Sequence, residues 1–305
     1  MNGLLHEGQN KQRSKVMPII EPAIRPPAEA NSFLLQVTSG CSSNLCTFCG
    51  VYKGKPFRIK SEREIYQDIE TGAALEPLKR RAFLMDGDAL VIPNAKLVPV
   101  LKKINTLFPK MTRIASYANG DNIVKRTGTE LGELAENRLR LIYIGLESGS
   151  QSILNDCKKR SSVNEMIEAV HKGAESGIKS SVMVLLGLGG CSKSKAHVKE
   201  TIHALNLMQP HYLSFLSLML IPGTEAYDRA QKGNFEELSP PELLQETYDM
   251  IAGLDLKATV FRADHASNLL PLEGRLPADK GRLLSTIEMA MKGKMILRPE
   301  YLRGL

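Results

Sequence analysis

Short apolar runs alternate with segments of helical periodicity along most of the sequence, and this alternation limits the fold more than any other feature. Strands that alternate with helices form parallel sheets. The predicted strands are residues 33–38, 81–85, 112–118, 139–146, 181–188 and 211–220. The predicted helices between them are residues 62–75, 95–107, 131–136, 162–176 and 194–207. Six units are too few for a closed eight-stranded barrel, so we expect an α/β protein with a partial, TIM-like (β/α)6 barrel.

The two ends of the chain depart from this pattern. Four prolines at or before position 27 favour an extended arm over residues 1–30. The strand–helix units occupy residues 31–235, and residues 236–305 are expected to form a helical extension. The elements expected in this extension are helices near 241–254 and 279–291 and one further short strand at 259–262.

Three of the five cysteines lie close together, directly after the first predicted strand. Cys41, Cys46 and Cys49 have the spacing C-x4-C-x2-C. The loops after the strands of a parallel barrel gather at one face, where ligands bind. Three thiolates in one loop can hold three irons of a [4Fe–4S] cluster and leave the fourth iron open to a substrate or cofactor. A zinc site or a closed four-cysteine cluster would instead need a distant Cys or His as the fourth ligand.

The number and placement of the cysteines also bear on the cell compartment. An odd number of cysteines without a visible secretory signal argues against a disulfide framework. Cys157 and Cys191 are isolated and are expected to be buried as small apolar residues. No apolar run approaches the roughly 20 residues that a membrane span requires, so we expect a cytoplasmic protein without a membrane anchor.

The cysteine loop, with Phe48 just before its last cysteine, resembles the cluster loop of radical S-adenosylmethionine (SAM) enzymes. The usual spacing in that family is C-x3-C-x2-C, so this chain has one additional residue in the first gap. The similarity extends from about Gln36 to Leu270. It is greatest to the branch that includes oxygen-independent coproporphyrinogen dehydrogenases and Elongator-like enzymes. The segments CSSNLCTFCGVYKGKPFR, LMDGDAL and FRADHASNLL further resemble stand-alone radical SAM proteins without a settled reaction.

This resemblance implies how the cofactors are held. The three clustered cysteines would ligate an oxygen-sensitive [4Fe–4S] cluster, and the amino and carboxylate groups of SAM would chelate the open iron. Phe48 would support the adenine. Gly87 and Asp88 stand where the family has a glycine-rich motif that receives the SAM ammonium group, although Asp86–Ala89 could also be a helix-capping turn.

The resemblance implies further SAM contacts after the later strands. Ser116 follows the third strand and is a candidate contact. Glu147, in the sequence GLESG, would accept hydrogen bonds from SAM, and Lys159 would pair with its carboxylate. The alternative for the basic run at 158–160 is a solvated helix end. Gly187 would let the backbone approach the adenosine, whereas Met183 replaces a polar residue that binds ribose in some relatives.

The substrate is less clear from the sequence. Asn119, Arg262, His265 and Asn268 are candidates to face an anionic substrate at the barrel mouth, although 262–268 could be a solvated loop. The net charge of +7 permits an anionic metabolite or a nucleic acid. We see no appended RNA-binding or cobalamin-binding domain, which favours a small metabolite. The basic residues that keep tRNA as an alternative are Lys292, Lys294, Arg298 and Arg303.

The resemblance implies a radical reaction. A reduced cluster would cleave SAM to methionine and a 5′-deoxyadenosyl radical, which would abstract hydrogen from an unidentified substrate. Such an enzyme would need a reducing partner of the flavodoxin or ferredoxin type. The alternatives are a radical SAM enzyme that modifies tRNA, an iron–sulfur electron carrier or scaffold without SAM chemistry, and a zinc-stabilised nucleic-acid-binding module.

Overall fold

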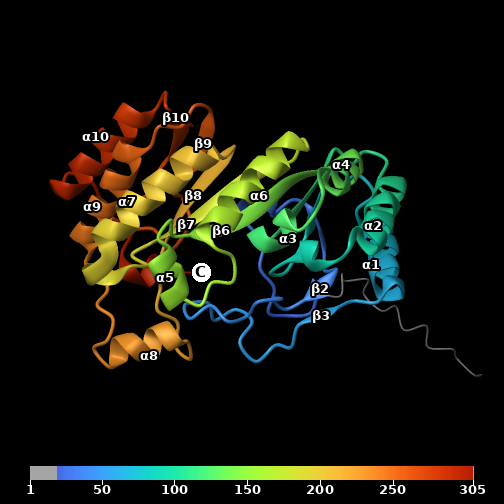
Figure 1. Ribbon diagram of the computed structural model, residues 1–305, viewed down its shortest axis with the longest axis horizontal. Helices are drawn as coiled ribbons and strands as arrows, with labels where there is room; N and C mark the ends of the chain where they lie inside the picture. The colour runs from blue at the N-terminus through green and yellow to red at the C-terminus, as the bar shows by residue number, and fades with distance from the viewer. Residues whose placement is uncertain (1–18, 305) are drawn as a thin grey trace, which may run out of the picture.

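Eight strands of the computed structural model, which describes residues 19–304, form one sheet in the order β1-β4-β5-β6-β7-β8-β9-β10 (Figure 1). Their bounds are β1 Phe33–Leu35, β4 Arg81–Leu84, β5 Arg113–Tyr117, β6 Leu139–Glu147, β7 Lys179–Leu186, β8 Tyr212–Ser217, β9 Thr259–Arg262 and β10 Glu273–Leu276. The first seven pair in parallel, and β10 pairs with β9 antiparallel. The expected α/β class and open parallel barrel are therefore confirmed.

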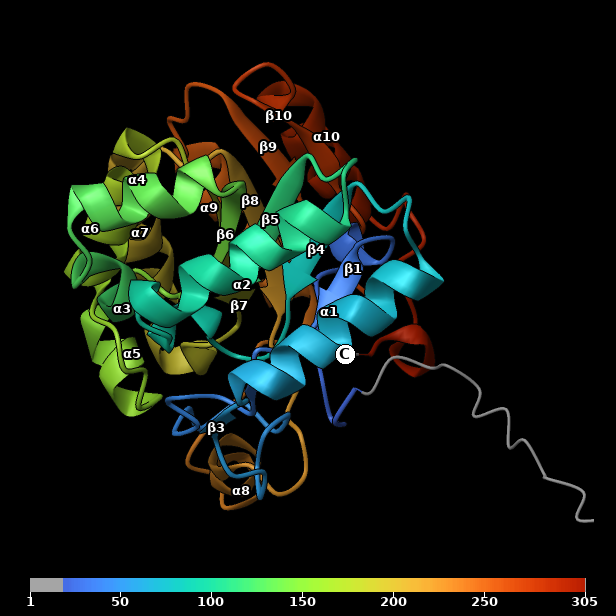
Figure 2. The same ribbon diagram turned by 90° about the vertical axis from the view of Figure 1, so that its right-hand side faces the viewer.

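Helices follow the strands and cover one face of the sheet (Figures 1 and 2). The longer ones are α1 Glu62–Leu75, α2 Asn94–Leu107, α4 Gly128–Glu136, α6 Val163–Glu175, α7 Gly190–Met208, α9 Pro240–Gly253 and α10 Lys280–Met291. Shorter elements are α3 Gly120–Val124, α5 Gln151–Asp156, α8 Glu225–Gln231, the hairpin of β2 Thr38–Ser39 and β3 Arg58–Ile59, and the 3-10 turns η1 Pro27–Glu29, η2 Ala89–Val91 and η3 Glu300–Leu302. Capping boxes of the Ser/Thr-x-x-Glu type start α1, α4, α6 and α9, so the sequence itself fixes where these helices begin.

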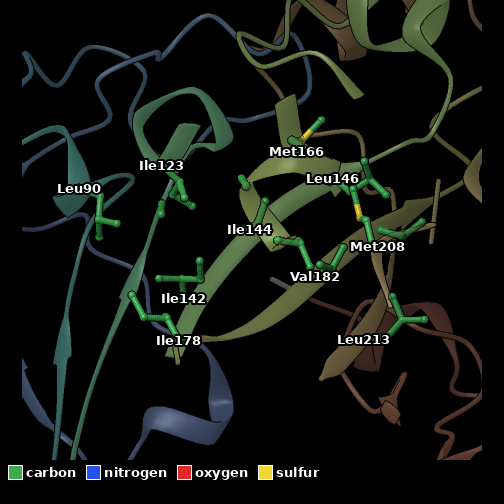
Figure 3. Close-up of a cluster of buried hydrophobic side chains, with 14 of the residues drawn as sticks. Leu90, Ile123, Ile142, Ile144, Leu146, Met166, Ile178, Val182, Met208 and Leu213 are labelled. Carbon is green, nitrogen blue, oxygen red and sulfur yellow. The ribbon is translucent and has the colours of Figure 1, made fainter. Parts of the chain in front are cut away.

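Along each strand, side chains point alternately to the core beneath the helices and to the concave face of the sheet. On β6, Ile142, Ile144 and Leu146 point outward and are buried beneath the helices. Figure 3 shows these side chains packed with Val182 of β7 and Met208 of α7. The intervening residues of each strand face the concave side. This large outer core makes the sheet a rigid platform for residues at the ends of the strands.

The described part of the N-terminal arm lies against the concave face. Ile19 and Ala23 pack on a second, smaller cluster that includes Phe83 and Tyr143. Glu29 is fully buried, accepts a hydrogen bond from the Tyr143 hydroxyl at 2.8 Å, and pairs with Arg113. The arm therefore fills the part of the concave face formed by β4, β5 and β6. Residues 1–18 of the expected arm lie outside the described residues.

The sheet continues into the C-terminal part of the chain. The extension expected from residue 236 contains helices α9 and α10, but it also supplies strands β9 and β10 to the main sheet. The short strand expected at 259–262 is present as β9, whereas β10 was not expected, and both make the extension continuous with the barrel. Within residues 19–304, no helix combines the length and the apolar character that a transmembrane helix needs.

Two helical glycines give a matched test of the packing. A Cβ atom on Gly72 of α1 would lie 2.1 Å from Cε2 of Phe33, whereas a Cβ on Gly132 of α4 would meet no atom within 4 Å. We expect Gly72→Ala to lower the free energy of unfolding by about 1–3 kcal/mol through overpacking. Gly132→Ala should raise it by up to about 1 kcal/mol, because alanine favours the helix. Urea unfolding measures both, and equal shifts of the same sign would contradict this packing.

Candidate functional site

The cysteine loop connects β2 to β3 at the end of the barrel where α8 also lies (Figures 1 and 2). Cys41, Cys46 and Cys49 are free and partly buried, whereas Cys157 is buried in a small apolar cluster as expected. Cys191 is only partly buried and packs against the edge of the main core. Burial raises the pKa of Cys46 to about 11, and the two neighbouring thiols add to the rise. The three clustered thiols are thus close enough to influence one another's charge.

The three thiols are the candidate ligands of a metal centre. Among residues 19–304, no three His, Cys, Asp or Glu side chains are arranged to hold a metal ion. A [4Fe–4S] cluster attaches each cysteine to a different iron, whereas a zinc ion needs ligands that converge on one point.

The first cysteine gap, residues 42–45, contains a left-handed residue, Asn44. Its backbone has φ +44°, in the left-handed region that asparagine tolerates better than most residues. The Asn44 side-chain amide donates to the Tyr52 carbonyl at 2.9 Å. The next part of the loop is held by backbone hydrogen bonds from Thr47 N to Cys157 O and from Ala226 N to Thr47 O, both 3.0 Å. The longer gap is thus a bonded turn.

Gly87 packs directly against the start of the cysteine loop. An added Cβ would lie 2.7 Å from both Cβ and Sγ of Cys41, so any side chain here would push that cysteine aside. The Gly87 amide also donates to the Gly40 carbonyl at 3.2 Å. The preceding Asp86 is buried and accepts hydrogen bonds from Gln36 and Tyr52. The structure therefore places Gly87 at the site, in contact with a proposed cluster ligand.

Asp88 joins the cysteine loop to the segment after β5. It is fully buried, and burial raises its pKa, while its hydrogen-bond donors act in the opposite direction. It accepts hydrogen bonds from Ser42 Oγ at 3.0 Å, from Asn119 Nδ2 at 3.0 Å, and from Asn122. Asp88 and Asn119, expected to contact SAM and substrate, are thus bonded to each other. We infer that they position the loop.

A buried arginine that the sequence did not indicate, Arg126, holds the segment around η2 and the helix α3. The Arg126 guanidinium donates to the carbonyls of Leu90, Ile92 and Asn122, each at 2.6 Å. It also donates to Asn94 Oδ1 at 3.1 Å. A lone arginine after a short helix gives no sequence signal of this role, because three of its four partners lie more than 30 residues away.

Ser116 lies on the outer side of β5. It is fully buried, and its hydroxyl donates to the Tyr117 carbonyl at 2.7 Å. The structure therefore does not bring Ser116 to the site. Tyr117, the next residue, faces the concave side, where its ring packs edge-on against Phe83 and Tyr143. The side chain that β5 presents to the concave face is one residue further along than expected.

Glu147 and Lys159 form an ion pair beside the cysteines. Glu147 Oε1 lies 3.0 Å from Lys159 Nζ, and the two side chains are only 16% and 11% exposed. Burial alone would lower the pKa of Lys159, but the negative charges of Glu147, Cys46 and Cys41 raise it overall. Lys159 is therefore a charged ammonium group close to a carboxylate and to the thiols, and its side chain is not the solvated helix end considered as the alternative.

The neighbours of this pair explain why Lys159 alone points inward. Lys158 pairs with Glu225 at 2.6 Å, and Arg160 pairs with Asp121 at 2.8 Å. Both basic side chains are thus held away from Glu147. On the other side, a Cβ on Gly145 would lie 2.0 Å from Glu147 Oε1 and 2.9 Å from Lys159 Nζ. The pair thus occupies the space that a side chain at position 145 would fill.

Gly187 ends β7 in a left-handed turn with φ +78°. Its amide donates to Oε1 of Glu246 on α9 at 2.6 Å. The next residue, Leu188, packs with Phe48, Cys157 and other apolar residues. A cavity of about 260 Å³ opens beside this cluster, and residues lining it include Phe48, Cys157, Leu188, Arg229 and Phe235. Phe48 therefore lies close to the residue that follows Gly187.

The remaining candidates divide between the concave face and the core. Arg262 is exposed on β9, opposite to the buried Phe261, and forms no ion pair with residues 19–304. Cross-strand pairing puts Gly145, Met183, Ser214 and Arg262 in one row across the concave face.

The other two candidates have partners within the protein. Asn268 is buried and donates to the carbonyls of Phe215 and Ala263 while accepting from the Ser217 hydroxyl. His265 Nδ1 lies 2.9 Å from Ser267 Oγ. Arg262 is therefore the candidate of this segment that is open to a ligand.

The sequence is similar to that of a known protein family. A family model described as the Radical SAM superfamily matches residues 35–205, more than half of the chain. No curated protein matches the sequence.

Several solved structures share the fold at low sequence identity. The radical SAM methyltransferase TsrM from Kitasatospora setae matches at 17% identity and TM-score 0.52, over 65% of this chain and 40% of its own. The coproporphyrinogen III oxidase HemN from Escherichia coli matches at 13% identity and TM-score 0.53, over 72% of this chain and 51% of its own. The Elp3 protein of Methanocaldococcus infernus matches at 17% identity and TM-score 0.52, over 87% of this chain and 64% of its own. The chain thus spans about half or less of TsrM and HemN.

The assignment of the cysteines can be tested by metal analysis. After anaerobic reconstitution, the protein should bind about four irons and four sulfides per chain. Cys41→Ala, Cys46→Ala and Cys49→Ala should each lose most of this iron and the visible absorbance of the cluster. Cys191→Ala, outside the loop, is the control and should keep both. Full iron content in any of the three loop variants would contradict the assignment.

Proposed function

Because the chain belongs to the radical SAM superfamily, we propose that it is an enzyme that uses a [4Fe–4S] cluster and SAM to abstract hydrogen from a small organic substrate. Cys41, Cys46 and Cys49 would hold the cluster. Glu147 and Lys159 would hold the amino and carboxylate groups of SAM, and Phe48 and the Gly187 turn would border its adenosine. The single observation that carries this proposal is the Glu147–Lys159 pair beside three free thiols.

This pair has the charges that SAM binding requires. The amino acid part of SAM carries an ammonium and a carboxylate, so a carboxylate and an ammonium side by side can bind both through charge-assisted hydrogen bonds. When bound and reduced, the cluster supplies the electron that cleaves SAM to methionine and a 5′-deoxyadenosyl radical. Gly145 leaves room for the pair, and Gly87 fixes Cys41. These residues bind and orient the cofactors, and no acid–base pair is needed for this step.

The concave face supports a small substrate. Its residues on β7 and β8, including Met183, Tyr212 and Ser214, are only partly buried, whereas the outward residues of the same strands are buried almost completely. From Gly145 to Arg262 the row crosses three strand spacings, or about 14 Å. We therefore place SAM toward Gly145 and Met183 and the small molecule over Ser214 and Arg262. We infer that the Arg262 guanidinium binds a carboxylate or phosphate of this molecule.

The tRNA alternative is less well supported by the C-terminal residues on which it depends. Arg298 donates to the carbonyls of His265 and Asn268, and Arg303 donates to that of Ser267. Lys292 lies 3.9 Å from Glu288. Arg303 also pairs with Glu300, so two of the four basic residues have a carboxylate partner, and the two arginine side chains are held against backbone carbonyls rather than free to reach phosphates.

The proposed chemistry also sets the conditions under which the enzyme works. An oxygen-sensitive cluster with an open iron requires a reducing compartment, so we place the protein in the cytoplasm. A flavodoxin or ferredoxin type of protein would deliver the electron. Free cysteines are the expected state in such a compartment.

Lys159 provides the test of SAM binding. Under anaerobic conditions with dithionite, the reconstituted protein should convert SAM to 5′-deoxyadenosine and methionine. Lys159→Met should weaken SAM binding by about 10- to 100-fold, because a charge-assisted hydrogen bond contributes roughly 1.5–3 kcal/mol. Lys158→Met, which removes a surface ion pair next door, should bind SAM as the wild type does. Absence of 5′-deoxyadenosine with a full cluster would contradict the proposed function.

Arg262 provides the test of the substrate site. Anionic metabolites, collected from a cell extract on an anion-exchange resin, should increase 5′-deoxyadenosine formation by the wild type. Arg262→Gln should lose most of this increase while its cleavage of SAM without metabolites stays unchanged. Arg63→Gln, an exposed arginine on α1, is the charge-matched control. If only the unretained fraction stimulates the enzyme, the substrate is not an anion.

A further inference from the structure

Behind the proposed SAM site, three buried side chains form a chain of polar contacts. Ser148 Oγ lies 2.8 Å from Nδ1 of His197, and Nε2 of His197 lies 3.8 Å from Oε1 of Glu246. All three side chains are almost completely buried. They come from the turn after β6, from α7 and from α9. Three parts of the fold therefore meet in one polar network under the functional end of the barrel.

Despite its composition, this network is not built as a catalytic triad. The Ser148 hydroxyl oxygen accepts a hydrogen bond from the Ser150 amide at 3.0 Å and shares a second hydrogen bond with His197 Nδ1, which also lies 3.4 Å from Thr201 Oγ1. His197 Nε2 forms no hydrogen bond within residues 19–304, so its approach to Glu246 at 3.8 Å is a packing contact. Burial lowers the pKa of His197 to about 4, so the ring is neutral. The serine has no access to a substrate.

At one end, the network holds the turn that carries Glu147. Glu147 has φ +61°, a left-handed conformation that costs a non-glycine residue about 1 kcal/mol or more. Helix α7 holds this turn by two hydrogen bonds, from Ser148 to His197 and from the Gly149 amide to Thr201 Oγ1 at 2.8 Å. A Cβ on Gly149 would lie only 2.3 Å from the Glu200 carbonyl, so the turn lies directly on the helix.

At the other end, Glu246, which packs against His197 without a hydrogen bond to it, holds the turn that carries Gly187. Glu246 Oε1 accepts the Gly187 amide at 2.6 Å, and its other oxygen accepts the Ser194 hydroxyl. Because β6 and β7 are neighbouring strands, the Glu147 and Gly187 turns lie on adjacent strand ends. His197 is the side chain between them, 2.8 Å from one holding residue and 3.8 Å from the other.

We propose that His197 is a positioning residue that, with Glu246, fixes the Glu147 turn relative to the Gly187 turn and thereby sets the geometry of SAM binding. This inference rests on the proposed function, because it assigns both turns to SAM. Removing the imidazole leaves the Ser148 hydroxyl without its hydrogen-bond partner on α7 and lets the strained Glu147 turn relax. The position of the Glu147–Lys159 pair relative to the Gly187 turn is then no longer fixed.

Two substitutions of His197 separate positioning from simple packing. His197→Asn keeps a polar atom near the position of Nδ1, whereas His197→Leu fills the space without one. Gly72→Ala, on α1, is the control, because it should destabilise the fold without contact to either turn. Thr201→Val removes the Gly149 acceptor with little change of shape. It gives a second test of the same turn should His197→Leu fail to fold.

Two readouts are measured on the reconstituted protein. Before SAM is added, hydrogen exchange of the Gly149, Ser150 and Gly187 amides should be at least about 10-fold faster in His197→Leu than in the wild type. The SAM dissociation constant, read from the change that SAM produces in the EPR spectrum of the reduced cluster, should rise about 10-fold. His197→Asn should recover most of both effects. Thr201→Val should speed exchange at Gly149 and weaken SAM binding less, by a few-fold.

Normal SAM binding by the variants would contradict the proposed role of His197. If Gly72→Ala weakens SAM binding as much as His197→Leu does, or if His197→Leu binds SAM normally, the network is only structural and the inference is overturned. If the wild type itself does not bind SAM, the proposed function fails. The exchange data then still report whether the network holds the two turns, so the two failures are distinguishable.

Discussion

The Glu147–Lys159 ion pair is the contact on which the functional end of this protein depends. A buried ammonium or carboxylate alone would cost several kcal/mol in lost hydration, so each requires the other. The pair also needs its surroundings: the missing side chain at Gly145, the left-handed turn at Glu147, and the ion pairs that hold Lys158 and Arg160 outward. When a zwitterionic ligand binds, the carboxylate and the ammonium of the pair can each bind the opposite charge of the ligand. No charge is then left unpaired.

The rest of the site is held by buried polar groups from distant segments. Asp88 connects the cysteine loop to the segment after β5, and Arg126 fixes the chain on either side of η2. The Ser148–His197 contact does the same for the turn after β6. In a parallel barrel the helices position the strands, but the loops at their ends have no such scaffold of their own. Buried hydrogen bonds supply it, because breaking one leaves an unsatisfied polar group inside the protein.

The sequence predicted what depends on local periodicity and missed what depends on distant partners. Helix α1 and strand β9 were predicted at their observed bounds, because capping and apolar spacing are local signals. The short helices α5 and α8 and the strand β10 were not predicted, since a few residues give too weak a period. The face of β5 on which Ser116 lies could not be predicted, because a strand has period two and polarity alone does not say which face is concave.

The concave face extends the same reasoning to the substrate. The arm fills the side formed by β4 to β6 with apolar and aromatic contacts, and Glu29 closes that side by its bonds to Tyr143 and Arg113. What remains partly exposed lies over β7 to β9, on the same row as Gly145 and ending at Arg262. The arm thus confines a ligand to one half of the concave face. A molecule bound there by an anionic group at Arg262 would present its opposite end toward Met183, where a SAM molecule held by Glu147 and Lys159 would have its ribose.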